Sequence, residues 1–99
     1  MSYELNFYES ALKEWKKLDK QTQNLFKKKL KERLNDPIVQ ASKLRGMQDC
    51  YKIKLVASGY RLVYQVIDNE LVVLVITVGR RDKNIYQRAA DIVSSLRNR

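Results

Sequence analysis

Three apolar runs rich in β-branched and aromatic residues follow one another closely in the second half of the chain. They restrict the fold more than any other feature and predict strands at 50–57, 60–67 and 70–79. The linking pairs "SG" and "DN" are short enough for tight hairpin turns, so neighbouring strands should pair antiparallel. The run "LVVLVITV" at 71–78 does not alternate with polar residues, which is typical of a central strand covered on both faces.

One strand and two helices are predicted before these three strands. Residues 2–8 alternate apolar with polar side chains, as a half-buried strand does. In "SALKEWKKLDK" the apolar residues recur at helical spacing, and Asp19 is suited to cap a second helix. Pro37 ends that helix because it has no N–H and disfavours a helical residue before it. The expected apolar stripes are Leu12, Trp15 and Leu18 in the first helix, and Leu25, Phe26, Leu30 and Leu34 in the second.

A third helix is predicted at the C-terminus, from Asn84 to Arg99, after a connecting loop at 38–49 and the three strands. The order βααβββα predicts an α+β fold, in which an N-terminal helical hairpin and a C-terminal helix pack on a small antiparallel-type sheet. Ninety-nine residues suffice for one modest core, so we expect a single domain spanning 1–99. The apolar face of the third helix contains Ile85, Ala89, Ile92, Val93 and Leu96.

The charge balance points to an anionic partner. The formal net charge is +9 and the sequence pI is about 9.8, which favours nucleic acid, an anionic membrane surface or an acidic protein as the partner. Cys50 is the one cysteine, which excludes an internal disulfide, and the absence of histidine argues against a zinc site. The start of the chain lacks the pattern of a secretory signal, and no apolar run is long enough to span a bilayer. We therefore expect a cytoplasmic protein with no metal or cofactor.

The first predicted hairpin, "CYKIKLVASGYRLVYQV", carries three cations and no acidic residue. With a two-residue turn at "SG", Arg61 lies opposite Val56, and residues two apart along a strand share a face. Lys52, Lys54 and Arg61 then gather on one face, where they are either simply solvated or are neutralised by a bound anion. The helices can cover the other face, which holds Tyr51, Ile53, Leu55, Tyr60, Leu62 and Tyr64.

Such a group of cations could support RNA cleavage. The RNA 2′-hydroxyl is the nucleophile, so an enzyme needs only to remove its proton, stabilise the phosphorane and protonate the departing 5′-oxygen. A lysine can act as the base if its pKa falls from about 10.4, and neighbouring cations lower it. Arginines can hold the phosphate bidentately, and a tyrosine such as Tyr86 can stack on a base or orient the phosphate. Arg80, Arg81 and Lys83 follow the third strand, but the alternation alone does not decide which arginine faces the cluster.

The segment "KLRGMQDCYKIKLVASGYRLVYQVIDNELVVLVITVGRRDKNIY" strongly resembles the RelE toxins of bacterial toxin–antitoxin systems. The likeness spans essentially the whole chain and includes "ALKEWKKL" near its start. It implies a RelE-like microbial ribonuclease fold and an enzyme that enters the ribosomal A site, cleaves mRNA there and stops translation. It further implies neutralisation by a cognate RelB-like antitoxin, and a complex of the two proteins that binds operator DNA and represses its own promoter.

The resemblance also implies a catalytic set, consisting of Lys52, Lys54, Arg61, Arg81 and Tyr86. The family's roles make Lys54, helped by Lys52, the general base, while Arg61 stabilises the transition state. Arg81 is the family's proposed acid, but a free arginine has a pKa above 12, so we expect it first to bind phosphate. The segment between "GRR" and Tyr86 is one residue shorter than the family's pattern.

Further basic residues are candidates for contacts with ribosomal RNA. Arg45 and the second helix, with Lys27, Lys28, Lys29, Lys31 and Arg33, fit such contacts, as do Arg80 and Lys83. The helix can equally be a solvated basic face.

Two other functions compete with the ribonuclease. One is a non-catalytic, ParE-like inhibitor of DNA gyrase, a type that shares the fold but lacks the lysine and arginine set. The other is a plain basic RNA- or DNA-binding module that cleaves nothing. The C-terminal helix adds a hypothesis on regulation, since an antitoxin helix of similar pattern could compete for its groove on the sheet.

Overall fold

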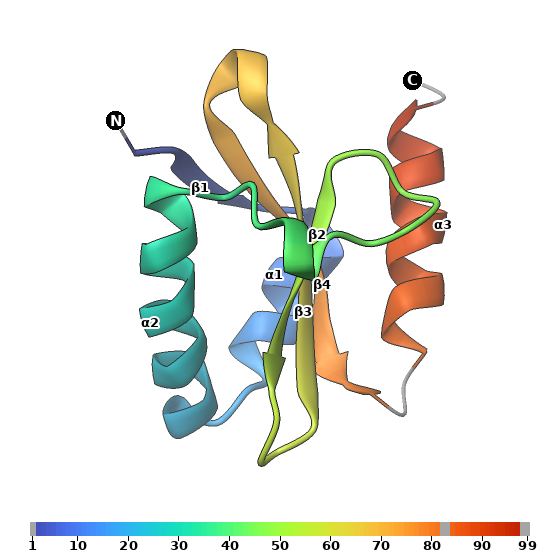
Figure 1. Ribbon diagram of the computed structural model, residues 1–99. Coiled ribbons are helices and arrows are strands. Elements are labelled where there is room, and N and C mark those ends of the chain that lie inside the picture. The colour runs from blue at the N-terminus through green and yellow to red at the C-terminus, as the bar shows by residue number, and fades with distance from the viewer. Residues whose placement is uncertain (1, 82–83, 98–99) are drawn as a thin grey trace.

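A computed structural model describes residues 2–81 and 84–97, which form three helices and one four-stranded sheet (Figure 1). The helices are α1 (Glu9–Lys16), α2 (Lys20–Asn35) and α3 (Ile85–Arg97), and two 3-10 turns, η1 (Gln40–Ser42) and η2 (Asp68–Glu70), lie in the connections. The strands are β1 (Glu4–Phe7), β2 (Cys50–Leu55), β3 (Tyr60–Ile67) and β4 (Val72–Arg80). The predicted α+β class and the predicted order of elements are confirmed. None of the described helices is long and apolar enough to cross a bilayer.

The strands lie in the order β1–β4–β3–β2. β2, β3 and β4 are antiparallel neighbours, as predicted, whereas β1 pairs with β4 in parallel, with Leu5 opposite Val73. The sheet is therefore mixed, because α1 and α2 carry the chain away from β1 before the meander begins. β4 lies between two partners and is buried on both faces, as its uninterrupted apolar run predicted.

The connections in both hairpins are longer than predicted. The last pair before the first loop is Leu55 with Tyr60, so four residues connect β2 and β3 instead of the two-residue turn at "SG". The N–H of Gly59 donates to the carbonyl of Leu55 (2.9 Å), and its φ of +76° suits a glycine. Consequently Lys54, not Val56, lies opposite Arg61. The second hairpin likewise closes at Ile67 and Val72, with η2 between them.

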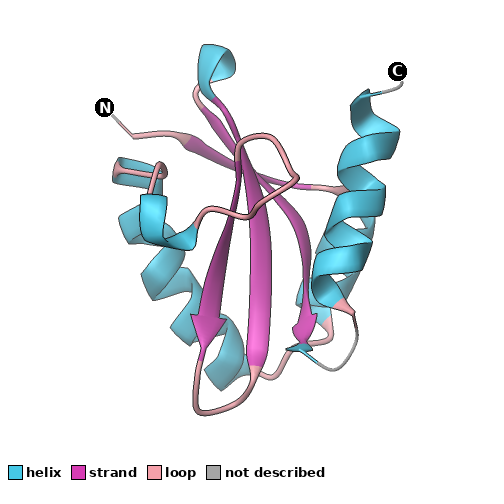
Figure 2. Cartoon of the chain, turned by 45° about the vertical axis from the view of Figure 1, so that its right-hand side comes forward, coloured by secondary structure: helices cyan, strands magenta, loops and turns pink. Residues whose placement is uncertain are grey.

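Helices cover both faces of the sheet (Figures 1 and 2). α1 and α2 enclose one core against the sheet, in which Phe26 of α2 packs with Leu62 and Tyr64 of β3. α3 encloses a second core on the opposite face, where Val63 and Ile76 contact its buried side. α3 packs mainly on β4 and β3 and shares its core with Cys50 at the start of β2, so the remainder of β2 on that face lies outside its main contacts.

The ends of α2 follow the sequence signals, but part of the predicted apolar stripe is wrong. The Asp19 carboxylate accepts a hydrogen bond from the N–H of Thr22 (3.3 Å), which confirms it as the N-cap. Thr22, Phe26 and Leu30 form the buried face at a spacing of four residues. Leu25 lies about 100° around the helix from Phe26 and is 46% exposed, and Leu12 of α1 is 39% exposed.

Candidate active site

Three cations gather on the face of the sheet that α3 leaves partly open, and we call Lys52, Lys54 and Arg61 the basic cluster. Lys54 pairs directly across the ladder with Arg61, and Lys52 precedes Lys54 by two residues on the same face. The predicted grouping is therefore confirmed although the predicted register is wrong. Among residues 2–81 and 84–97 the only ion pair joins Arg88 to Glu14, so no described carboxylate forms an ion pair with the cluster, although Glu32 of α2 lines the same hollow as Lys52 and Lys54.

The environment of Lys52 favours its neutral amine. Partial burial lowers the pKa of Lys52, and the neighbouring charge of Lys54, a hydrogen bond with Lys54 and the charge of Arg61 lower it further. A lysine with a lowered pKa is suited to accept a proton near neutral pH.

Arg80 and Arg81 lie in different surroundings at the end of β4. Arg80 pairs with Tyr60, and its guanidinium carbon lies 5.7 Å from the centroid of the Tyr60 ring, on the face covered by α1 and α2. Arg81 is exposed, and its N–H donates to the carbonyl of Gly59 (2.9 Å), which fixes it beside the β2–β3 loop. Arg81 follows Gly79 by two residues, and Gly79 pairs with Arg61. Lys83, predicted to bind RNA, lies outside the described residues.

Gly79 lets the start of α3 approach this end of β4. A β-carbon at Gly79 would lie 3.0 Å from Cδ1 of the buried Ile85, so any larger residue there would displace the helix or that side chain. Tyr86 follows Ile85 and is 36% exposed. The close approach therefore brings the first turn of α3, and with it Tyr86, to the end of the strand that carries Gly79 beside Arg61.

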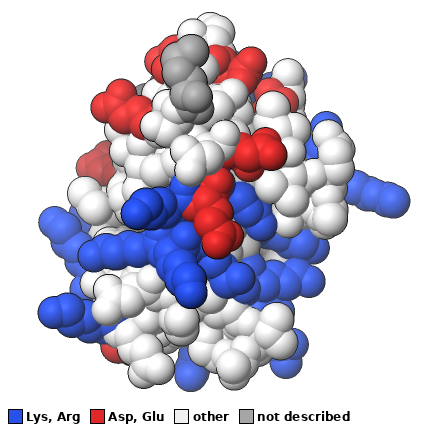
Figure 3. Space-filling view, turned by 60° about the vertical axis from the view of Figure 1, so that its left-hand side comes forward, with Lys and Arg blue, Asp and Glu red and all other residues white. Residues whose placement is uncertain are grey.

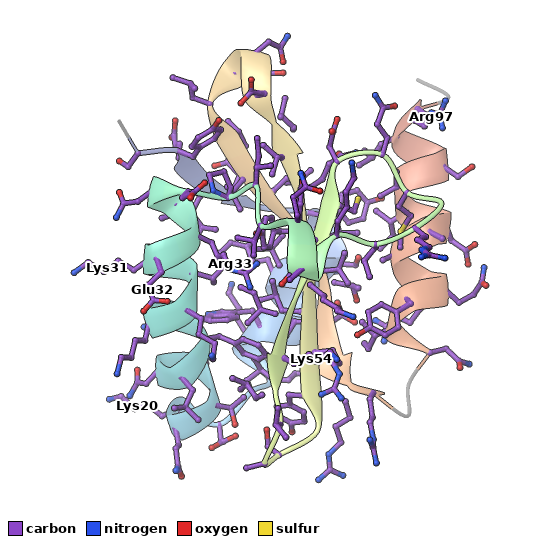
Figure 4. All side chains as sticks on the ribbon, in the orientation of Figure 1. Lys20, Lys31, Glu32, Arg33, Lys54 and Arg97 are labelled. Atoms are coloured by element: carbon purple, nitrogen blue, oxygen red, sulfur yellow. The ribbon has the colours of Figure 1, made fainter. Side chains whose placement is uncertain are left out.

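The predicted rRNA-binding lysines lie away from the basic cluster. Lys27, Lys28 and Lys31 are exposed on α2, which covers the opposite face of the sheet, and Lys31 points away from the sheet (Figure 4). Arg45 is exposed in the loop before β2, where it lines a hollow of about 540 Å³. α2 thus lies on the other side of the sheet from the cluster, whereas the loop of Arg45 lies toward the α3 face, because its neighbours Leu44 and Met47 pack in the core beneath α3.

Basic and acidic side chains are distributed unevenly over the surface. From the side of α2, lysines and arginines form a belt across the middle with an acidic side chain inside it, whereas most other acidic side chains in this view lie toward the end that holds the β3–β4 connection (Figure 3). At that end the Tyr3 hydroxyl donates to the Asp68 carboxylate, and the charges of Asp68 and Asp36 help to raise the pKa of Tyr3.

Arg33 was predicted to belong to the basic outer face of α2, and the structure contradicts this. Its side chain turns inward to the sheet and donates to the backbone carbonyl of Lys52 (3.3 Å) (Figure 4). The sequence did hold a signal, because Arg33 follows Phe26 and Leu30 at spacings of seven and three residues, on the buried side of the helix.

Cys50 is a packing residue, as predicted. It is fully buried beneath α3, and burial raises the pKa of its thiol to about 12, so the thiol stays protonated and unreactive. No group of His, Cys, Asp and Glu side chains that could hold a metal ion occurs in the part of the chain that the structure describes.

Comparisons with known proteins identify the class. Residues 5–85 match the family model described as the ParE toxin of the type II toxin–antitoxin system. The chain belongs to this RelE/ParE family of toxins.

The similar proteins within this family are RelE or RelE-like toxins. The mRNA interferase toxin RelE of Escherichia coli K12 is 58% identical over 90 residues, which cover 90% of this chain and 95% of the relative. A RelE-like toxin of E. coli is 53% identical, covering 92% and 97% of the two chains. The structure matches a variant of E. coli RelE in the free state with a TM-score of 0.85 at 55% identity, covering 92% and 97%. It also matches RelE of the intact E. coli RelBE toxin–antitoxin complex with a TM-score of 0.79 at 61% identity, covering 80% and 96%.

Proposed function

We propose that this protein is the toxin of a type II toxin–antitoxin system and an endoribonuclease that cleaves mRNA in the ribosomal A site. The observation that carries the proposal is the basic cluster, in which a lysine of lowered pKa lies beside a second lysine and an arginine on an open face. Relatives named as mRNA interferases share 58% of the sequence, which supports the same chemistry here.

The lysine pair acts as the general base. Lys54 is the more exposed of the two and reaches the 2′-hydroxyl, while Lys52 supplies the neutral amine that the proton finally occupies. The 2′-oxygen then attacks phosphorus and the bond to the 5′-oxygen breaks, leaving a cyclic 2′,3′-phosphate and a 5′-oxygen that takes up a proton from solvent at this open face. Because the pKa of Lys52 is lowered, a larger fraction of this amine is neutral than of a free lysine at the same pH.

The remaining residues of the catalytic set act on the phosphate and the base. Arg61 stabilises the charge that develops on the phosphorane, and Arg81 binds the same phosphate from the end of β4. Arginine is the side chain least suited to give up a proton, so we assign Arg81 to phosphate binding rather than to proton donation. Tyr86, exposed at the start of α3, stacks on a base of the unpaired mRNA.

The partners follow from the same assignment. A cognate RelB-like antitoxin neutralises the toxin, and their complex binds operator DNA. Solved complexes of E. coli RelE with RelB, 61% and 57% identical to this chain, support this partner. The ribosome positions mRNA for a site that has no histidine, so we expect free RNA to be a poor substrate. The reaction needs no metal or cofactor, and it takes place in the cytoplasm, where translating ribosomes are found.

The test maps the 5′ ends of mRNA after brief expression of the wild type and of Lys54→Ala. The wild type should give cuts at fixed positions within codons, and Lys54→Ala should lose them because the exposed member of the base pair is gone. The matched control is Lys13→Ala, which removes an exposed lysine of α1 far along the chain from the cluster. This variant should give the same cleavage pattern as the wild type. A folded Lys54→Ala protein that still cleaves would remove Lys54 from the mechanism.

Inhibition of DNA gyrase is the second candidate, and the ParE description of the matching family model favours it. Pulse labelling after induction separates the two functions, because a gyrase inhibitor stops DNA replication first and an mRNA interferase stops protein synthesis first. A basic module that only binds RNA would instead show salt-sensitive binding without any strand cleavage.

A further inference from the structure

Arg33 reaches from the buried side of α2 to the edge of the sheet, directly beneath the strand that carries the two lysines. The side chain is half-buried and points from the helix toward β2 (Figure 4). A hollow of about 310 Å³ opens between α2 and β2, and Arg33 lines it together with Lys52 and Lys54.

The Arg33 guanidinium donates to three acceptors in three different segments. One terminal nitrogen donates to the Lys52 carbonyl (3.3 Å) and to the Tyr64 hydroxyl (2.7 Å), and the other donates to the Ser42 hydroxyl (3.2 Å). The Tyr64 hydroxyl in turn donates to the carbonyl of Pro37 (2.8 Å). Arg33 therefore connects α2 with β2, with β3 and with η1.

Aromatic packing holds the guanidinium in place. Its central carbon lies 5.7 Å from the centroid of the Tyr64 ring, and the Tyr64 ring stacks on Tyr51 with centroids 5.6 Å apart. Both tyrosines are buried in the core beneath α1 and α2. The hydrogen bonds of Arg33 thus start from a side chain whose position is set by the core.

β2 needs such support because it is the edge strand of the sheet. Its outer side forms one isolated bridge, between Tyr51 and Lys43, and beyond this bridge no described strand pairs with it. The hydrogen bond from Arg33 is accepted by the backbone carbonyl of Lys52, the residue that follows Tyr51. An edge strand held at that point keeps the Lys52 amine at a fixed distance from Lys54 and Arg61.

We propose that Arg33 is a positioning residue for the reaction, which holds the edge strand β2 at Lys52 through its forked guanidinium. This inference rests on the proposed ribonuclease function. Arginine is suited to the task because its planar group presents five donors in a fixed geometry, whereas an ammonium on a flexible stem cannot reach three separate acceptors. Geometry, and not charge alone, is therefore what Arg33 contributes.

Lys29 offers a matched control for charge. It lies one helical turn before Arg33, lines the same hollow and carries the same charge, but it makes no described hydrogen bond to β2. The experiment compares Arg33→Lys, Arg33→Met and Lys29→Met with the wild type. It measures amide hydrogen exchange at residues 52–54 in the free protein, and kcat and KM for mRNA cleavage on programmed ribosomes.

Both Arg33 variants should exchange faster at 52–54 and lose about 10- to 100-fold in kcat, with little change in KM, because a displaced base slows the chemical step. Lys29→Met should leave exchange at 52–54 unchanged and raise KM in a salt-dependent manner. Ser42→Ala removes one of the three acceptors, so it should show the same changes as Arg33→Lys to a smaller degree, and it serves if Arg33→Met does not fold.

Wild-type kcat and exchange in Arg33→Lys would overturn the inference, since charge alone would then suffice. Unchanged exchange at 52–54 in both Arg33→Lys and Ser42→Ala would overturn it as well. Hydrogen exchange is measured without RNA, so it tests the support of β2 by Arg33 independently of catalysis. Failure of the wild type to cleave mRNA would refute the proposed function alone.

Discussion

At the scale of single residues, Lys52 combines partial burial with two cationic neighbours, and its titration can be observed directly. We expect the ε-carbon NMR signal of Lys52 to titrate below 10.5, the ordinary pKa of a lysine. Lys54→Met and Arg61→Met should each raise the pKa of Lys52, because each removes a cation that lowers it. A Lys52 signal that titrates with the surface lysines would contradict the proposed base.

The same shift makes stability depend on pH. Since folding lowers the pKa of Lys52, the folded chain binds fewer protons than the unfolded chain between the folded pKa and 10.5. The contribution of Lys52 to the free energy of unfolding therefore rises with pH across that window, and at neutral pH this residue costs stability.

The residues of the basic cluster could be predicted from the sequence because side chains alternate strictly along strands. Replacing a two-residue loop by a four-residue loop shifts the register by an even number, so Lys52, Lys54 and Arg61 keep their common face. Arg33 could not be placed by charge alone. Its inward direction depends on hydroxyl and carbonyl acceptors that only tertiary packing brings to it.

At the scale of elements, the Glu14 carboxylate joins α1 to β4 and α3. It accepts hydrogen bonds from the Thr77 hydroxyl (2.9 Å) and the N–H of Val78 (3.3 Å), and it pairs with Arg88 of α3. β1 ends opposite Val75, so Val78 has no strand partner on that side, and Glu14 supplies the missing acceptor.

We expect Glu14→Ala to cost more stability than Arg88→Ala. Loss of Glu14 leaves the buried Thr77 hydroxyl and a strand N–H without their acceptor, a cost of about 1–3 kcal/mol. The Arg88 side chain is 43% exposed, so the ion pair itself should contribute at most about 1 kcal/mol. Urea unfolding of both variants measures the difference. Equal losses in the free energy of unfolding would show that the ion pair contributes more than the hydrogen bonds from Thr77 and Val78 to Glu14.

The ends of α2 carry local sequence signals and were predicted correctly, whereas the irregularity in β4 was not. Asp19 and Pro37 mark the ends of α2 because their chemistry acts locally. The bulge in β4 has no such mark. Val63 pairs with Thr77 while Tyr64 pairs with Val75, so Ile76 is an extra residue, and Arg80 turns to the Tyr60 face as the chain continues. The parallel pairing of β1 likewise depends on how the helices pack.

At the scale of the whole molecule, the basic cluster lowers stability in the free protein. Like charges directly opposite on neighbouring strands repel, so Lys54→Gln should raise the melting temperature by about 1–5 °C at low salt while abolishing mRNA cleavage. The gain should shrink at high salt, because the repulsion is screened. Lys13→Gln, outside the cluster, should change neither property. Calorimetry at two ionic strengths makes the comparison, and a lower melting temperature for Lys54→Gln at low salt would contradict it.

The concentration of acidic side chains toward one end of a basic surface gives the protein an electric dipole moment. On the proposed function, phosphates of the ribosome would repel the end near Asp68 and attract the belt around the middle, so the approaching protein would experience a torque as well as a net attraction. The torque would orient the protein before contact, so a larger fraction of encounters would occur in the orientation that allows binding.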